Sequence, residues 1–321
     1  MSLLLPLQLP KHAYFEGQIV PFEKATISVM NHTFNYGTGA FGGIRGNWND
    51  DEQQLFVFRP IDHFTRFLES AKLLTFKLDY TPEKLLQIML GLLRTENWHT
   101  NIYIRPLAYI KNNLIGVKLH GLDYDVTMFS LPFGSYVPNE EGSHVTFSSW
   151  RRVDDNSVPA RGKLTGSYVN SAFIKSDAVM AGFDEALVLN QDGHLSEGSA
   201  ANVFIMRKGV VYTPPVTSDI LEGITRRTII DLLQNEMNVE VVQRDIDRTE
   251  VYLADEAFYS GTGVQIAAIT MVDHRPIGSG KMGPTVGALR DLYFSVVTGR
   301  SEKYRSWCTP VYETVPEKAS A

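Results

Sequence analysis

The spacing of hydrophobic residues changes several times in the first part of the chain. Alternation on either side of a Glu-Gly pair is typical of a β-hairpin, and apolar residues spaced three and four apart are typical of amphipathic helices. Thr81 is followed by Pro82, the order expected for a helix N-cap and a first helical residue. The pattern predicts a hairpin over residues 13–22, helices over 60–74 and 81–97, and strands over 101–110 and 125–136.

A polar stretch that contains proline and glycine, residues 137–144, interrupts this pattern and predicts a linker. Beyond it, short apolar runs alternate with helical segments that begin after Tyr168, Gly223 and Pro284. Hairpins mixed with helices favour an α+β (mixed α/β) fold over a doubly wound sheet, and no GxGxxG sequence follows a predicted strand. The strands predicted in this second part are 144–150, 185–190, 202–207, 239–246 and 256–261.

The composition is that of an ordinary globular protein, with 44% hydrophobic residues to build a core. A length of 321 residues exceeds the roughly 100 to 200 residues typical of one domain. With the linker as the boundary, we expect a smaller α/β domain over residues 1–137 and a larger domain over residues 138–321.

Charge and cysteine content narrow the classes of ligand. The net charge of −6 offers no basic face for nucleic acid, so a small molecule is the better expectation. Cys308 is the single cysteine, which excludes an intramolecular disulfide and a cysteine-rich zinc site and fits a reducing compartment. The apolar residues 1–10 are too short and too interrupted by proline for a signal peptide or a membrane span. We expect a soluble, cytoplasmic protein with no metal site and no membrane partner.

Two charged residues stand among unusually small neighbours. Lys163 lies in the sequence RGKLTGSY, where it is either a surface lysine in a loop or an amine that attacks a carbonyl to form a Schiff base. Glu197 lies in DGHLSEGSAANVF, where it is either a solvated loop residue or a carboxylate presented to a ligand. In both segments the small residues leave room for another molecule to approach.

Two glycine-containing segments are candidate anion sites. Residues 221–230 place a glycine turn at the start of an amphipathic helix, and residues 259–266 place glycine and threonine at the end of a strand. Exposed backbone N–H groups at such positions bind phosphate or carboxylate. A lysine for an aldehyde, a carboxylate for a ring nitrogen and N–H donors for a phosphate together match pyridoxal 5'-phosphate.

The order of these segments resembles the class IV (fold-type IV) pyridoxal-phosphate aminotransferases, and most closely the branched-chain amino acid aminotransferases. The resemblance runs from about residue 13 to about residue 307. It implies a transaminase of branched-chain amino acid biosynthesis that exchanges the amino group between L-leucine, L-isoleucine or L-valine and 2-oxoglutarate. It is carried by NYGTGAFGGIRGNW, HFTRFLESAKL, IYIRPLAYI, PFGSY, GKLTGSYVNS, HLSEGSAANVF, YTPPVTSDILEGITRRTI, YLADEAFYSGTG and VVTGRSEKYRSW.

The resemblance also implies roles around the cofactor. Lys163 would form the Schiff base with the cofactor and then move the substrate's α-proton. Tyr168 would bind the phenolic oxygen of the cofactor, and Glu197 would pair with its ring nitrogen. Arg66 would bind the phosphate, although helical periodicity alone places it towards solvent. The other implied phosphate ligands are Gly223, Ile224, Thr225 and Thr262.

The substrate pocket is implied in the same way. Arg105 is the most telling member, because an unpaired charge within an apolar alternating strand is costly. Residues 114–117, with the sequence LIGV, would reach in from a facing subunit, so a homodimer or a higher homo-oligomer is expected. The aromatic members could equally be core residues. The implied substrate-binding residues are Tyr36, Phe41, Gly43, Tyr103, Arg105, Tyr136, Thr262 and Gly263.

Two positions depart from the branched-chain pattern. Gly42 replaces a glutamate, and Ala201 replaces another glutamate that precedes Asn202. Both lie near the implied pocket and leave the substrate range open. An (R)-selective amine or D-amino acid transaminase and an aminodeoxychorismate lyase of the same fold remain alternatives. A phosphate-ligand binding protein that forms no Schiff base is the alternative outside enzymes.

Overall fold

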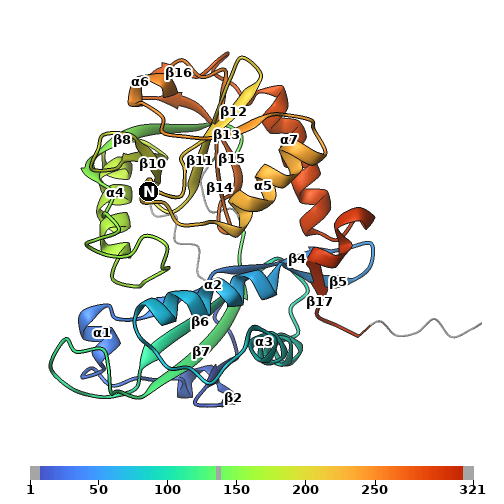
Figure 1. Cartoon of the computed structure of the whole chain (residues 1–321). Helices are drawn as coiled ribbons and strands as arrows, with labels where there is room; N and C mark the ends of the chain where they lie inside the picture. The colour runs from blue at the N-terminus through green and yellow to red at the C-terminus, as the bar shows by residue number, and fades with distance from the viewer. Residues whose placement is uncertain (1–7, 135–138, 314–321) are drawn as a thin grey trace, which may run out of the picture.

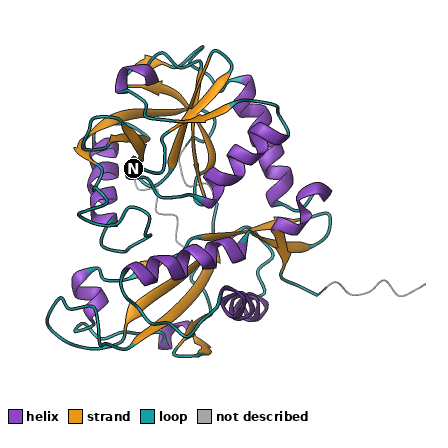
Figure 2. Cartoon of the chain, in the orientation of Figure 1, coloured by secondary structure: helices purple, strands orange, loops and turns teal. Residues whose placement is uncertain are grey.

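The computed structural model describes residues 8–134 and 139–313. Its elements form two β-sheets flanked by helices, which confirms the mixed α+β fold (Figures 1 and 2). Apart from its last strand, β17 (Cys308–Pro310), the first sheet precedes the undescribed residues 135–138, and the second sheet follows them. None of the helices in the described ranges is long and apolar enough to cross a lipid bilayer.

The first sheet has the strand order β17-β5-β4-β6-β7-β1-β2, with β3 paired to β6. Helices α2 and α3 place Phe64, Phe67 and Leu93 in one apolar cluster with Ile104 of the sheet. Each such side chain, once buried, contributes ~1.5–3 kcal/mol to folding. The elements are β1 (His12–Phe15), β2 (Gln18–Pro21), α1 (His32–Tyr36), β3 (Ala40–Phe41), β4 (Ile44–Asn49), β5 (Gln54–Phe58), α2 (Pro60–Leu73), α3 (Pro82–Glu96), β6 (Ile102–Ile110) and β7 (Tyr124–Pro132).

The local signals of this part of the chain are confirmed. The side chain of Thr81 accepts a hydrogen bond from the Lys84 N–H at 3.2 Å, and Pro82 is the first residue of α3. Glu16 and Gly17 form the hairpin turn with φ of 48° and 82°. Strand β7 ends at Pro132, four residues before the predicted end, and the last residues of that prediction lie outside the described ranges.

The second sheet has the order β10-β9-β8-β15-β14-β11-β12-β13, with β16 paired to β15. Helices α5 and α7 cover the apolar residues Phe204, Phe258 and Ile266 of this sheet, while α4 packs on Ala186 and Val188 of β9. The elements are β8 (Ser143–Arg151), α4 (Tyr168–Met180), β9 (Glu185–Leu189), β10 (Leu195–Gly198), β11 (Asn202–Arg207), β12 (Val210–Thr213), α5 (Ile224–Asn235), β13 (Val241–Gln243), α6 (Arg248–Val251), β14 (Glu256–Gly261), β15 (Gln265–Val272), β16 (Arg275–Pro276), α7 (Pro284–Val297) and β17 (Cys308–Pro310).

The last strand returns to the first sheet. Strand β17 pairs with β5, so the chain crosses between the sheets a second time near its C-terminal end. Phe56 and Phe58 of β5 share an apolar cluster with Phe258 and Tyr293 of the second part. We propose residues 1–137 and 138–321 as the two domains, with β17 as the segment of the larger domain that is added to the smaller domain's sheet.

Candidate active site

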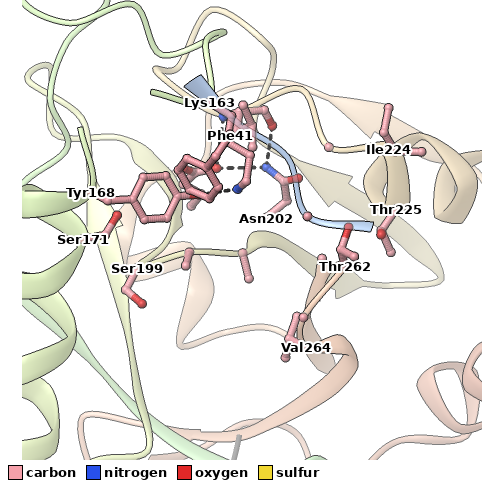
Figure 3. Close-up of a pocket in the computed structure, with 18 of the residues that line it drawn as sticks. Phe41, Lys163, Tyr168, Ser171, Ser199, Asn202, Ile224, Thr225, Thr262 and Val264 are labelled. Atoms are coloured by element: carbon pink, nitrogen blue, oxygen red, sulfur yellow. Dashed lines mark hydrogen bonds between the residues drawn. The ribbon is translucent and has the colours of Figure 1, made fainter. Parts of the chain in front are cut away.

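A cavity of about 430 Å³ lies between the two sheets. It is lined by side chains from β6, from the loop before α4, from β10 and from the loops before α5 and β15. Figure 3 shows Lys163, Phe41 and Tyr168 close together, with Ile224, Thr225 and Thr262 across the cavity from them. The predicted residues that line it are Phe41, Gly43, Arg66, Tyr103, Arg105, Lys163, Tyr168, Glu197, Gly223, Ile224, Thr225, Thr262 and Gly263.

The loop that carries Lys163 is bound to the first part of the chain. The N–H of Phe41 donates to the carbonyl of Lys163 at 2.9 Å, and the N–H of Lys163 donates to Oγ of Ser70 at 3.0 Å. The N–H of Gly166 donates to the carbonyl of Gly37 at 2.9 Å, and a Cβ on Gly37 would lie 2.8 Å from Cα of Gly166. The small residues around Lys163 therefore allow two backbone segments to approach closely and fix the position of the lysine.

The environment of Lys163 favours the neutral amine. Burial lowers the pKa of Lys163 to about 7, and the nearby positive charges of Arg66 and Arg105 act in the same direction. Nζ of Lys163 donates a hydrogen bond to the hydroxyl of Tyr168. Burial raises the pKa of Tyr168 to about 12, so this hydroxyl keeps its proton. A substantial fraction of Lys163 is therefore an unprotonated nucleophile near neutral pH.

Glu197 is 3% exposed and is held by three donors. Its Oε1 lies 2.8 Å from a guanidinium nitrogen of Arg152, and its Oε2 accepts from Nδ2 of Asn202 at 3.0 Å and from the N–H of Leu221 at 3.1 Å. Burial raises the pKa of Glu197, and the charge of Arg152 opposes that rise. With three donors directed at it, the carboxylate is arranged as an anion that can accept a proton or pair with a cation.

The start of α5 has the features of a phosphate site. Gly223 is the N-cap and supplies no side-chain hydrogen bond, so the N–H groups of the first turn have no intrahelical partner. A Cβ on Gly223 would lie 2.2 Å from Oδ1 of Asn202, so a larger residue there would displace the side chain that donates to Glu197. Arg66 lines the cavity beside this turn and donates to the carbonyl of Glu222 at 3.0 Å. The solvent-facing position that periodicity suggested for Arg66 is wrong, because α2 lies between the two sheets (Figure 1).

The other end of the cavity combines aromatic rings with a guanidinium group. Arg105 donates to the hydroxyl of Tyr103 at 3.0 Å and lies 4.6 Å from the ring centroid of Phe41. A Cβ on Gly43 would lie 2.2 Å from the Tyr103 hydroxyl, so only glycine leaves this ring in place. Gly42 does not line the cavity, and a Cβ there would lie 2.6 Å from Cγ of Pro106.

Of the predicted pocket residues, Tyr36 is placed differently and Tyr136 is not described. Tyr36 does not line the cavity. Its hydroxyl instead accepts a hydrogen bond from the N–H of Gly116 at 3.1 Å, which joins α1 to residues 114–117. Ile115 and Val117, in the same loop, are 76% and 74% exposed. Tyr136 lies outside the described residues.

Sequence reasoning missed two residues that hold Glu197. Arg152 directly follows β8, whose last three residues are exposed, so the sequence offered no sign that its side chain turns inward. Asn202 stood within the small-residue segment around Glu197, so its proximity in sequence was the available signal.

The cavity brings together a lysine amine, a tyrosine hydroxyl, a carboxylate and the free N–H groups of a helix N-terminus. This set of groups fits pyridoxal 5'-phosphate.

Known proteins are similar to this chain along nearly its whole length. The family described as "Amino-transferase class IV" matches residues 43–272. A probable branched-chain-amino-acid aminotransferase of Aquifex aeolicus is 43% identical over 301 residues, which are 94% of this chain and 97% of that protein. The branched-chain-amino-acid aminotransferase of Pseudomonas aeruginosa is 36% identical, with 93% and 96% covered.

Solved structures are similar to the same extent. The branched-chain aminotransferase of Thermoproteus uzoniensis with norvaline is 39% identical, with a TM-score of 0.90 over 94% of this chain and 100% of that chain. The branched-chain amino acid aminotransferase of Thermobaculum terrenum in its PLP form is 37% identical, with a TM-score of 0.91 over 95% of this chain and 99% of that chain.

Proposed function

This chain belongs to the class IV aminotransferases, and from that premise we propose that it transfers amino groups between branched-chain L-amino acids and 2-oxoglutarate. The family match and the relatives confirm the resemblance seen in the sequence. The observation that carries the proposal is Lys163, a cavity amine with a pKa lowered to about 7, in a chain similar to enzymes of this activity. The cofactor is pyridoxal 5'-phosphate.

Each part of the cofactor has candidate partners in the cavity. Lys163 would bind its aldehyde, Tyr168 its phenolic oxygen and Glu197 its ring nitrogen, since all three side chains line the cavity. Arg66 and the first turn of α5 would hold the phosphate, together with Thr262, which lies beside Thr225 (Figure 3). When bound, pyridoxal 5'-phosphate supplies an electron sink that stabilises negative charge on the substrate's α-carbon.

The residues of this chain supply the proton transfer. Nζ of Lys163, when neutral, would accept the proton that leaves the substrate's α-carbon and would then donate it to the cofactor. The hydroxyl of Tyr168 accepts a hydrogen bond from Nζ and orients that amine. The negative charge of Glu197, maintained by Arg152, favours a protonated ring nitrogen.

One pocket must accept both an aliphatic side chain and the side-chain carboxylate of glutamate. Phe41, Phe129 and Leu131 line the cavity and offer apolar contacts to leucine, isoleucine or valine. Arg105 offers the charged partner for the carboxylate of glutamate or 2-oxoglutarate, and its Nε is buried without an acceptor among the described residues. The substrates are therefore small amino acids and 2-oxo acids.

A homodimer is the proposed assembly. Ile115 and Val117 are apolar yet largely exposed, and the Tyr36 hydroxyl accepts a hydrogen bond from the backbone N–H of Gly116 between them. Because Tyr36 and residues 114–117 lie away from their own cavity, they would close the cavity of a second copy. The net charge of −6 supports small-molecule substrates over nucleic acid, and we place the enzyme in the cytoplasm.

A three-substrate comparison tests the proposal. Purified enzyme is assayed with 2-oxoglutarate as acceptor and L-leucine, D-alanine or (R)-1-phenylethylamine as donor. L-Leucine should give the highest kcat/KM. Faster conversion of D-alanine or the aromatic amine would contradict the branched-chain assignment and indicate another transaminase of this fold. A colourless protein that borohydride cannot label would indicate the binding-protein alternative.

A further inference from the structure

The hydroxyl of Thr165 joins the loop that carries Lys163 to the segment that follows α1. Its Oγ1 donates to the carbonyl of Gly37 at 2.5 Å and accepts from the N–H of Gly39 at 3.0 Å. The backbone N–H of Thr165 also donates to the carbonyl of Gly39 at 2.8 Å. One half-buried side chain, which does not line the cavity, therefore supplies a donor and an acceptor to a segment far away in sequence.

The contact continues from Thr165 along β3. Leu164 pairs with Ala40 in an isolated β-bridge, and the N–H of Phe41 donates to the carbonyl of Lys163 at 2.9 Å. The loop and the segment at residues 37–41 thus run side by side from Thr165 to the lysine. Because the two strands of contact are short, a bond lost at one end is felt at the other.

The segment ends with the ring of Phe41, which packs on the lysine amine. The ring centroid lies 4.8 Å from Nζ of Lys163 and 4.7 Å from the ring centroid of Tyr168, whose hydroxyl accepts from that amine. Phe41 is 6% exposed, so its ring contributes to the burial of the amine. Burial is the largest cause of the lowered pKa of Lys163. A displaced ring would therefore admit water and favour the charged form of the amine.

The charged and titratable groups that act on Lys163 come from several other elements. The two arginines favour the neutral amine, whereas Tyr103 and Glu197 favour the charged one. The hydroxyl of Thr165 makes no hydrogen bond to any of them among the described residues. The groups are Arg66 of α2, Tyr103 and Arg105 of β6, Tyr168 of α4 and Glu197 of β10.

We propose that Thr165 is a positioning residue for Lys163: its hydroxyl holds residues 37–41 against the lysine loop and thereby keeps the ring of Phe41 on the amine. Because the proposed function depends on Lys163, the role of Thr165 rests on that function. Thr165 itself touches neither the cofactor nor the substrate, since it does not line the cavity.

Capture of pyridoxal 5'-phosphate by the cofactor-free enzyme tests this role, because the aldehyde reacts with the neutral amine. The rate of capture is followed by absorbance over a range of pH. Thr165→Val puts a methyl group in place of the hydroxyl and leaves the N–H of Gly39 without its acceptor. The pH midpoint of capture should lie at about 7 in the wild type. It should be ~1 unit higher in Thr165→Val, which slows capture at pH 7 by ~5-fold. Thr165→Ser keeps the hydroxyl and should restore the wild-type midpoint.

Thr127→Val is the matched control. Thr127 is also half-buried, and its hydroxyl donates to the carbonyl of Tyr14 at 2.7 Å, but it does not line the cavity. That variant should keep the wild-type midpoint. Phe41→Leu should itself raise the midpoint, and adding Thr165→Val to it should cause little further shift, because both changes act on the same ring. Additive shifts would overturn the proposed route through Phe41.

Hydrogen–deuterium exchange of the wild-type cofactor-free enzyme needs no variant. The amide of Gly39, whose acceptor is the Thr165 hydroxyl, should exchange as slowly as the amide of Phe41, whose acceptor is the Lys163 carbonyl. Free exchange at Gly39, or an unchanged midpoint in folded Thr165→Val, overturns the role of Thr165 alone. A wild-type enzyme that captures no pyridoxal 5'-phosphate overturns the proposed function and the role of Thr165 with it.

Discussion

Replacing Glu197 with glutamine removes one negative charge and little volume from the cavity wall. Both oxygens of Glu197 accept hydrogen bonds, from Arg152, Asn202 and the N–H of Leu221. Because a glutamine amide has only one oxygen, its NH₂ group must face at least one of these donors. We expect the cofactor to remain bound, since Lys163 and the phosphate donors are unchanged, but the ring nitrogen loses its anionic partner.

The expected loss lies mainly in kcat. Removing one preorganised electrostatic contact from a site where charge develops costs ~10²–10³-fold in kcat. KM should change much less, because the contact acts chiefly in the transition state. The folded protein should lose ~3–5 kcal/mol of unfolding free energy, since the side chain of Arg152 is 8% exposed and stays buried without its carboxylate.

Single-turnover absorbance with L-leucine measures the chemical step, and urea unfolding measures stability. Glu185→Gln is the matched control. Glu185 is also 3% exposed and lies 2.9 Å from Nζ of Lys175, but it is outside the cavity. That variant should lose stability and keep its kcat. A near-normal kcat in Glu197→Gln would show that Glu197 is not the partner of the ring nitrogen.

Three further predictions follow from the site. Arg105→Ala should raise the activation free energy of the glutamate half-reaction by ~2 kcal/mol more than that of the leucine half-reaction. Equal decreases in the two rates, measured by stopped flow, would refute its role. Lys163→Met should raise the Tm of the cofactor-free protein at pH 7, because the folded pKa of Lys163 is lowered to about 7. That gain should shrink as the pH approaches ~10.5, and a pH-independent gain would contradict the lowered pKa. Ile115→Asp should give monomers, as measured by light scattering, and these should have low transaminase activity. A fully active dimer would exclude this loop from the interface.

Local sequence signals predicted much of the fold. The N-cap at Thr81 and the turn at Gly17 act through their own neighbours, so the sequence alone is sufficient to place them. Strand β15 was not predicted, although it is central to the second sheet. It is buried on both faces and parallel to β8, so it lacks the alternation that marks a half-exposed strand.

The site was predictable where residue type conflicts with simple packing, and through the family resemblance. Lys163 and Glu197 stood out among small residues, and the structure brings both to one cavity. Arg152 did not stand out, because its role depends on Glu197, a partner far away in sequence. Arg66 was ambiguous for the same reason. Its helix lies between two sheets, and periodicity cannot distinguish solvent from a second sheet.

The most direct test of the proposed role of Lys163 is to locate the cofactor on the chain. Holoenzyme is reduced with borohydride, digested and mapped by mass spectrometry, so that the amine bound to the cofactor's aldehyde carries a stable pyridoxyl label. The label should lie on Lys163, and Lys163→Ala, while folded, should be unlabelled and inactive. A label on any other lysine, or transamination by the Lys163→Ala variant, would contradict that role.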